Sequence, residues 1–361
     1  MISVLWRGTL LSAVADGRDN NFNLIRMIAA SCVLVSHAYP IAAGSNATQP
    51  LELLLSGMTL GAVAVYVFFG LSGFLIFRSY DRSPDFVRYW AARFLRLFPA
   101  LLAALAVTVL VGSILTTATQ FAYWQDVPGH LLRNATLVSS DYDLPGIFEN
   151  NPYPDAINGS LWTLRYEFAC YILAFVVGWI VSQNQEYGFK GFIICYTVFF
   201  AYISIADTSH HAEKFAELSF PFVIGMAFYR YRDRVYLSFP LMAISGGAAI
   251  ISSFTEMFEQ IFILLLLYAV FVLAYLPGGV LRYYRRLGDY SYGVYVYAFP
   301  VQQLMAYHGA TQPLENMAMA FPVTILPKPF SNTHNASVPK SAKAWAQSKS
   351  RPKTTARSPS S

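Results

Sequence analysis

Charged residues are scarce in this chain of 361 residues: Asp, Glu, Lys and Arg make up 12% of it, whereas soluble domains carry about 25%. Hydrophobic residues account for 55%, and the mean hydropathy is +0.42. So little charge cannot cover a soluble protein of this length, which excludes a soluble enzyme. The net charge of +5 would otherwise point to nucleic acid, but the long apolar runs exclude a nucleic-acid-binding module.

Cysteine is also scarce. The chain has three cysteines, each in an apolar run and none in a CxxC pair: Cys32, Cys170 and Cys195. Neither a disulfide framework nor a cysteine metal site is therefore expected. The sequence also lacks a glycine-rich phosphate loop, metal-ligand spacing and a GxSxG elbow, so we expect no metal and no resident cofactor. Residues 1–21 lack the continuous apolar core of a cleavable signal peptide.

Apolar segments, in contrast, are abundant. Nine can be marked, and a tenth begins near residue 317: 22–43, 58–78, 97–117, 161–182, 190–206, 216–229, 237–254, 258–276 and 290–308. Because about 20 apolar residues span a bilayer as a helix, the sequence predicts an all-α, polytopic membrane helix bundle of about nine to ten transmembrane helices. We divide it into an N-terminal segment (1–21), a membrane domain (22–325) and a tail (326–361).

Basic residues concentrate in alternate connections between these segments. The basic connections hold Arg78, Arg82, Arg88, Arg93, Arg96, Lys190, Arg230, Arg232, Arg234, Arg282, Arg285 and Arg286. The intervening connections hold only Arg133 and Lys214. By the positive-inside rule, the basic connections and the N-terminus lie in the cytoplasm, which predicts a multi-pass protein of the cell (inner or cytoplasmic) membrane.

Two segments outside the expected spans are unusual. The outer loop 118–160 is long and rich in aromatic and acidic residues, which is typical either of short interfacial helices or of a lid that contacts sugar. The tail 326–361 is rich in Ser, Pro and Lys, and we expect it to be disordered. Its seven basic residues and absence of acids account for the positive net charge, because the rest of the chain has 18 basic against 20 acidic residues.

Ionisable side chains within spans are costly and rare, so each is a candidate functional residue. Arg26 and His37 are eleven residues apart in the first span, which places them on one helix face about 16 Å apart along the axis. Arg26 is either a snorkelling interfacial arginine or a cationic site. His37 is either a histidine hydrogen-bonded between helices or a general base deep in the membrane.

Two further motifs lie toward the cytoplasmic side. Ser72 and Gly73 end the run Phe68-Phe69-Gly70-Leu71-Ser72-Gly73, which favours either close helix packing or irregular backbone that lines a cavity. Arg93 and Arg96 share a helix face, either as topology-setting charges or as an anion site that includes Arg26.

The fourth span opens with Asn158-Gly-Ser-Leu-Trp162-Thr-Leu-Arg165-Tyr-Glu167. It descends from the outer face, so that Glu167 lies about 10 Å inside. His37 reaches about 22 Å from the inner face of a core about 30 Å thick, which is a comparable depth. We therefore expect His37 to communicate with Glu167 or Arg165, directly or through water.

These features together resemble acyltransferase family 3, the membrane enzymes that O-acylate extracytoplasmic or cell-surface glycans. The matching motifs, in order over about residues 20–325, are Arg26-x10-His37, Phe68-Phe69-x-x-Ser72-Gly73, Arg93-x-x-Arg96, the Asn158–Glu167 stretch and Gly288-Asp-Tyr-Ser-Tyr-Gly-Val-Tyr295. The resemblance implies ten spans, a cytoplasmic acyl-CoA donor (usually acetyl-CoA), and essential roles for the Arg and His of the first span.

The same residues suit that chemistry. Arg26, Arg93 and Arg96 would hold the phosphates of CoA, and Ser72 and Gly73 would leave room for its pantetheine arm. His37 would activate a hydroxyl of a polysaccharide, lipopolysaccharide or other lipid-linked glycan, or carry the acyl group itself. Catalytic roles are thus expected for His37, Arg26, Glu167 and Ser72, and donor binding for Arg26, Arg93, Arg96 and Gly73.

The chain departs from the family pattern at two places. Many members have His where Ala298 stands here, so no second catalytic histidine is assumed. After Ile325 the sequence turns into the basic tail instead of completing the last span. Two other classes stay open: a transporter or exporter with Arg26, His37 and Glu167 as a proton or substrate pathway, and a catalytically inactive scaffold.

Overall fold

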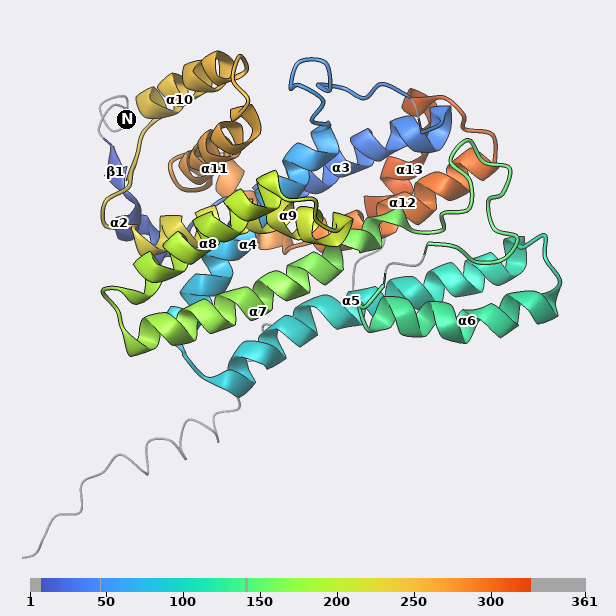
Figure 1. Ribbon diagram of the computed structural model, residues 1–361. Coiled ribbons are helices and arrows are strands. Elements are labelled where there is room, and N and C mark those ends of the chain that lie inside the picture. Colours follow the sequence, from blue (N-terminus) through green and yellow to red (C-terminus); the bar gives the residue numbers. More distant parts are fainter. Residues whose placement is uncertain (1–7, 46, 140–141, 326–361) are drawn as a thin grey trace, which may run out of the picture. The chain divides into compact units, whose positions relative to one another are not determined.

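The computed structural model describes residues 8–45, 47–139 and 142–325, which are predominantly helical (Figure 1). In chain order the elements are β1 (Thr9–Leu10), α2 (Leu11–Ala15), α3 (Phe22–Ala43), α4 (Leu60–Arg82), α5 (Phe86–Leu115), α6 (Gln120–Ala135), η1 (Gly159–Leu161), α7 (Trp162–Gln183), α8 (Gly188–Ile205), α9 (His210–Arg230), β2 (Tyr236–Leu237), α10 (Phe239–Ser252), α11 (Phe258–Tyr275), η2 (Gly279–Leu287), α12 (Ser291–Tyr307) and α13 (Pro313–Ile325). The expected disordered tail 326–361 lies outside the described residues.

Each apolar segment marked in the sequence lies on a helix. Six helical segments of the described residues are long and apolar enough to cross a membrane: α3, α4, α5, η1 with α7, α8 and α11. By contrast, α12 has 17 residues and α13 has 13. The class of an all-α membrane bundle is thus confirmed, whereas the count of nine or ten spans stays a prediction.

Helix α5 begins well before the predicted segment 97–117. The Asp85 carboxylate caps it by accepting a hydrogen bond from the Arg88 amide at 2.7 Å. The helix therefore runs for 30 residues, about 45 Å. As a result, Arg93 and Arg96 belong to the helix itself rather than to a connecting loop.

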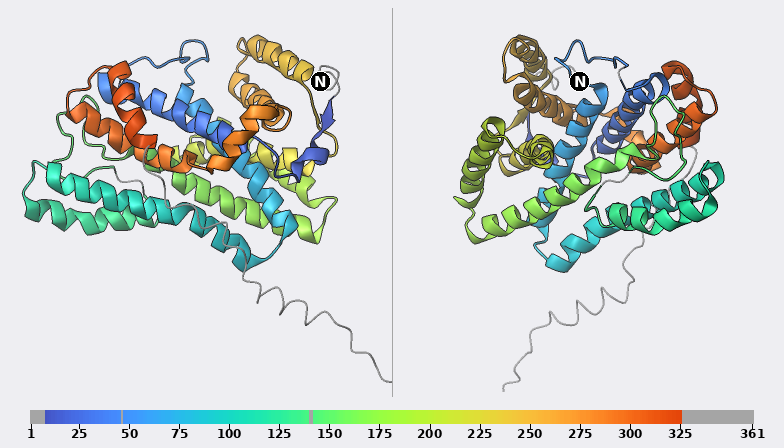
Figure 2. Two further views of the ribbon diagram at one scale, coloured as in Figure 1. Left: turned by 180° about the vertical axis from the view of Figure 1, so that it is seen from behind. Right: turned by 45° about the vertical axis from the view of Figure 1, so that its right-hand side comes forward.

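Helices α4 and α9 approach each other closely through glycines. A Cβ atom at Gly73 would collide with the backbone carbonyl of Phe222, and one at Gly225 would collide with the carbonyl of Gly70. The small residues therefore let the two backbones touch, as is typical of helix pairs in membranes. On the other side of the bundle, α3, α12 and α13 lie together (Figure 2).

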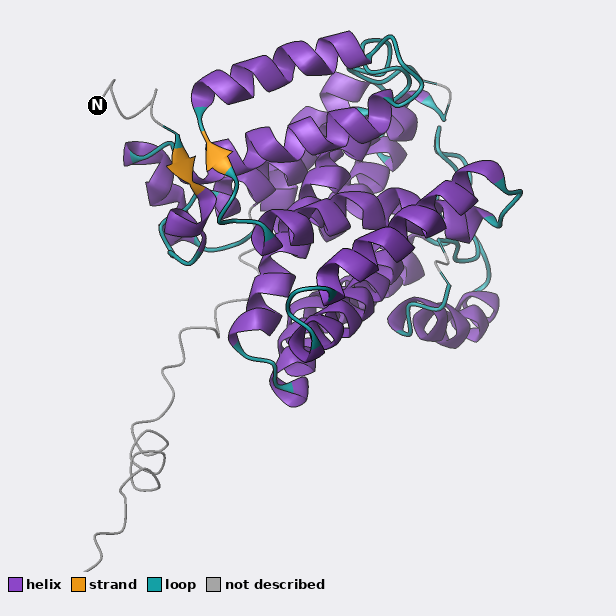
Figure 3. Ribbon diagram, turned by 60° about the vertical axis from the view of Figure 1, so that its left-hand side comes forward, coloured by secondary structure: helices purple, strands orange, loops and turns teal. Residues whose placement is uncertain are grey.

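The connections predicted as cytoplasmic meet at one end of the bundle, which we call the basic end. There, β1 pairs with β2 in an antiparallel register, Thr9 opposite Leu237 (Figure 3). Arg82 forms an ion pair with Asp16 at 2.8 Å. These contacts tie the N-terminal segment to two sequence-remote connections.

The predicted outer loop contains a helix of its own. Thr119 caps α6 by accepting from the Ala122 amide at 3.3 Å. The buried Tyr123 hydroxyl donates to the Val109 carbonyl of α5 at 2.7 Å, and burial raises the pKa of Tyr123 to about 12. The loop is thus partly a helix packed along α5, and its contact with sugar stays a prediction.

Candidate active site

Helix α3 holds the two ionisable residues of the first span on one face. Arg26 is 5% exposed, and its guanidinium forms an ion pair with the Asp289 carboxylate, with 3.1 Å between Nη1 and Oδ2. Asp289 lies in the short connection between η2 and α12. Its other oxygen accepts from the Ser291 hydroxyl at 2.5 Å, which fixes the carboxylate at the start of α12. Arg26 is therefore a paired interior charge, not a snorkelling side chain.

A cavity of about 40 Å³ lies between α4, α5, α7 and α12. Three residues singled out in the sequence line it from three different helices: Ser72, Arg96 and Glu167. Its remaining polar lining consists of hydroxyls, namely those of Thr163, Ser291, Tyr292 and Tyr295. The cavity has room for a few water-sized groups among charged and hydroxylic side chains.

The charges around this cavity form one electrostatic group. Arg96 makes no hydrogen bond or ion pair within the described part of the chain, but it interacts electrostatically with Glu167 and Asp289. Arg26 interacts with the same two carboxylates and with Arg96. The Tyr171 hydroxyl donates a hydrogen bond to Glu167. Two arginines thus share two carboxylates, and one guanidinium keeps free donors for an anion.

The charges of this group determine the direction in which the pKa of Asp289 is shifted. Burial alone would raise its pKa, but the positive charges of Arg26 and Arg96 and the hydrogen bonds from Ser291 hold the pKa below its ordinary value. The carboxylate is therefore ionised at neutral pH, which keeps the ion pair with Arg26 intact.

His37 lies apart from the charges. Its ring packs edge-on against Phe299, with 5.3 Å between ring centroids, and its buried Nδ1 has no hydrogen-bond partner among the described residues. Within the described part of the chain, no hydrogen bond or ion pair joins His37 to Glu167, which interacts with the arginines, or to Arg165, whose guanidinium lies 5.3 Å from the Tyr166 ring centre. Glu167 is instead engaged with Tyr171 and the arginine cluster, and the expected communication of His37 with Glu167 or Arg165 through water stays a prediction.

Arg93 and Arg96 share a helix face but have different surroundings. Arg93 is 4% exposed and donates to the carbonyls of Tyr89 at 3.0 Å and Ile76 at 3.4 Å. Its guanidinium carbon lies 3.8 Å from the Tyr89 ring centre. Two of its nitrogens thus donate to backbone carbonyls, and its role in binding the acyl-CoA donor stays a prediction.

Gly73 does not line the cavity. The space beside it is filled by the Phe222 backbone of α9. The expectation that Gly73 leaves room for a pantetheine arm is therefore wrong, because the glycine serves helix packing. Ser72, which precedes Gly73 on α4, does line the cavity.

Sequence reasoning named Asp289 only within a motif and assigned it no role. It is the one acidic residue in the basic connection 276–290. A single acid among arginines is a feature from which an ion-pair partner could have been predicted. Tyr171, Tyr292 and the hydrogen-bonded pair of Thr163 and Tyr295, 2.7 Å apart, gave no such signal. Within the described residues, no group of three or more His, Cys, Asp or Glu side chains is arranged to hold a metal ion.

Fold and site together define a multi-pass membrane protein with a polar, charge-lined cavity inside its helix bundle. Residues 19–327 match the family model of the acyltransferase domain. The chain therefore belongs to this acyltransferase family, as the motifs predicted, and it is an O-acyltransferase.

Two relatives extend this comparison. An O-acetyl transferase of Shigella phage Sf6 is 29% identical over 300 residues, which cover 80% of this chain and 86% of the relative. Nodulation protein 10 of Rhizobium leguminosarum bv. viciae is 32% identical over 172 residues, 44% of each chain. No solved structure matches.

Proposed function

We propose that this protein transfers an acetyl group from acetyl-CoA, at the cytoplasmic face of the cell membrane, to a hydroxyl of a surface polysaccharide, lipopolysaccharide or other lipid-linked glycan. The observation that carries the proposal is the convergence of Arg26, Arg96 and Glu167 around a cavity, with the unpartnered Nδ1 of His37 farther along the same face of α3. The name of the phage relative, an O-acetyl transferase, supports acetyl as the group transferred.

The arginines act on the donor. Arg96 offers free guanidinium donors at the cavity, and Arg26 lies beside it. Guanidinium groups bind phosphates through paired, charge-assisted hydrogen bonds. We assign the phosphates of CoA to these arginines, and we place the path of its pantetheine arm beside Ser72, where the cavity of about 40 Å³ must widen when the donor binds. The arm then directs the thioester toward the level of His37.

His37 acts on the acceptor. A neutral imidazole with an unpartnered nitrogen can accept the proton of a sugar hydroxyl. The sugar oxygen attacks the thioester carbonyl, the C–O bond forms, and the C–S bond breaks. The thiolate of CoA then takes up the proton. In the covalent variant, the His37 nitrogen attacks first and the acyl group passes from it to the sugar.

Transfer of label tests both donor and acceptor. Membrane vesicles containing the protein are supplied with radiolabelled acetyl-CoA, and label is measured in the extracted glycan. We expect labelled O-acetyl esters with the wild-type chain and none with His37→Ala. The matched control is His210→Ala, an exposed histidine at the start of α9, which should retain full transfer. Glycan that stays unlabelled with the wild type would refute the proposal.

A further inference from the structure

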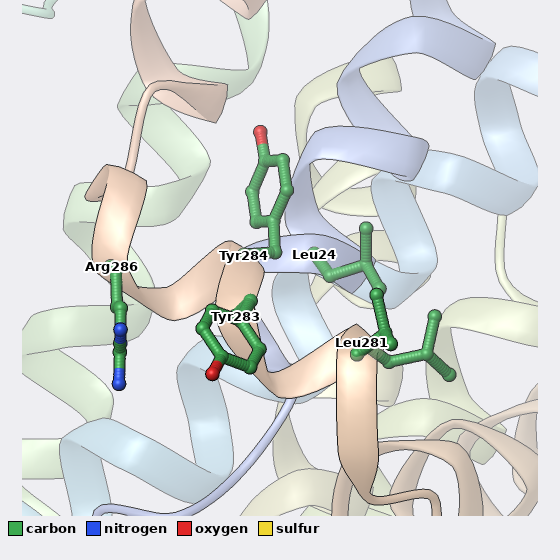
Figure 4. Close-up of a pocket in the computed structure, with 6 residues that line it drawn as sticks. Leu24, Leu281, Tyr283, Tyr284 and Arg286 are labelled. Atoms are coloured by element: carbon green, nitrogen blue, oxygen red, sulfur yellow. The ribbon is translucent and has the colours of Figure 1, made fainter.

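A groove of about 450 Å³ lies at the basic end, between the start of α3 and η2 (Figure 4). Apolar and aromatic side chains and one arginine line it: Leu24, Val280, Leu281, Tyr283, Tyr284 and Arg286. Leu24 and Arg26 are two residues apart on α3, so they project about 200° apart. The groove therefore lies on the opposite side of α3 from the active site.

The geometry of η2 explains the composition of the groove. In a 3-10 helix, residues three apart lie above one another. Val280, Tyr283 and Arg286 form one such row, and Leu281 and Tyr284 lie in the next. Both rows line the groove, so that η2 presents an apolar and aromatic surface with an arginine at its end.

The third row of η2 anchors the segment to the bundle. Arg282 donates to the carbonyls of Tyr275 and Asp19, both at 2.6 Å. Arg285 donates to the Arg18 carbonyl at 2.9 Å. The hydrogen bond from Arg282 also lowers the pKa of Asp19, which is therefore ionised at neutral pH. These contacts hold the groove-lining rows in an exposed position.

The exposed side chains of these two rows are apolar or aromatic, so we expect them to contact a partner less polar than water. Val280 is 84% exposed and Tyr283 is 60% exposed. Arg286 makes no hydrogen bond or ion pair within the described residues, and its guanidinium carbon lies 4.4 Å from the Tyr283 ring centre. Figure 4 shows the Tyr283 hydroxyl and the Arg286 guanidinium pointing the same way, whereas Leu24 and Leu281 lie together at the other side.

We propose that this groove binds one anionic phospholipid of the leaflet at the basic end. Acyl chains contact Leu24, Val280 and Leu281, Tyr283 lies at the level of the interface, and Arg286 binds the anionic headgroup. The charge of the basic end is complementary to such a lipid. The nucleotide of CoA is the less favoured occupant, because the walls are apolar and the groove does not open toward Arg26.

The bound lipid has a structural consequence for the active site. Gly288, with a positive φ of 93°, is the only residue between η2 and Asp289. A lipid that fixes η2 therefore also fixes the carboxylate that pairs with Arg26. The lipid is thus a positioning ligand for the ion pair, without contact to the reacting atoms.

Lipid binding to the purified full-length chain tests the proposal without any acyl transfer, so the result is independent of the proposed function. Native mass spectrometry in detergent measures binding of phosphatidylglycerol and of phosphatidylcholine. We expect tighter binding of phosphatidylglycerol. Arg286→Gln should weaken that binding about fivefold, equivalent to about 1 kcal/mol for one arginine at a membrane surface, and should leave phosphatidylcholine unchanged.

The matched control is Arg234→Gln, an exposed arginine of the α9–β2 connection, which should leave the affinity for both lipids unchanged. Leu281→Ser should weaken binding of both lipids, because it removes an apolar wall. Equal binding of the two lipids by the wild type, or equal effects of the two arginine variants, would overturn the proposal. Displacement of phosphatidylglycerol by free CoA would also overturn it and assign the groove to the nucleotide.

Discussion

The ion pair between Arg26 and Asp289 allows a quantitative test of the site. Asp289→Asn keeps the shape of the side chain and the oxygen that accepts from Ser291, but removes the charge facing Arg26. Breaking one side of a buried pair costs about 3–5 kcal/mol, because an uncompensated charge stays inside. The side chain of Arg26 is 6% exposed and that of Asp289 is 29% exposed. We therefore expect the lower end, a loss of about 3 kcal/mol.

A double-mutant cycle separates this charge effect from lost packing. Arg26→Met fills similar volume without charge, and the double variant Arg26→Met/Asp289→Asn contains no buried charge at this position. Unfolding in mixed micelles with increasing SDS gives the free energy of each variant. We expect the double variant to be more stable than Asp289→Asn alone, with a coupling energy of about 2–3 kcal/mol. A coupling energy near zero would refute the assignment of the pair.

The pH dependence of stability adds an independent measurement on the same pair. The folded-state pKa of Asp289 lies below its ordinary value, so its stabilisation is fully present above the unfolded pKa of about 3.9. It is lost as pH falls from there through the folded pKa. The wild type should therefore lose stability in this acidic window more steeply than Asp289→Asn. Parallel profiles would contradict the pKa assignment.

Three further predictions concern catalysis and packing. His37→Gln should lower acyl transfer about 10²–10⁴-fold, the usual contribution of general base catalysis, without changing the free energy of unfolding. Arg96→Gln should raise the KM for acetyl-CoA more than it lowers kcat, because Arg96 has free donors at the cavity, whereas Arg93→Gln should mainly lower stability. Gly73→Ala should destabilise the fold by about 1–3 kcal/mol through overpacking against Phe222, whereas Ser72→Ala should leave stability nearly unchanged.

Each of these expectations has an opposite outcome that would contradict it. A fully active His37→Gln enzyme would remove His37 from the mechanism. An unchanged KM for Arg96→Gln, measured by titrating acetyl-CoA in vesicles, would remove the arginine from the donor site. A Gly73→Ala variant as stable as Ser72→Ala in mixed-micelle unfolding would show that α4 and α9 are not in close contact.

The parts of the fold set by local pattern could be predicted from the sequence. Apolar runs located the helices, and the spacing of Arg26 and His37 placed both on one face of α3. Of the functional classes left open by the sequence, the match to the acyltransferase family then supported an enzyme rather than a transporter. These inferences depend on residues close together in the chain, where helix periodicity determines geometry.

Contacts between remote segments could not be predicted in this way. Arg26 and Asp289 are 263 positions apart, and no periodicity relates them. The depth of Glu167 was estimated from helical rise alone, which says nothing about the direction of its side chain. For Gly73 the sequence left both close helix packing and a cavity lining open, because it does not show which backbone approaches a glycine. Family motifs supplied the residues, but only the packing of helices showed their partners.

The close contact of α4 with α9, which we call the glycine seam, limits the substitutions that this protein can accept. At most helix contacts a larger residue on one side can be accommodated by a smaller one on the other. Here the carbonyl groups of Gly70 and Phe222 meet glycines directly, so the obstacle is backbone and no compensating substitution exists. Homologous chains that keep this seam should therefore show glycine at positions 73 and 225 without correlated exchange. A larger residue at either position would mark a chain in which α4, and with it Ser72, is placed differently.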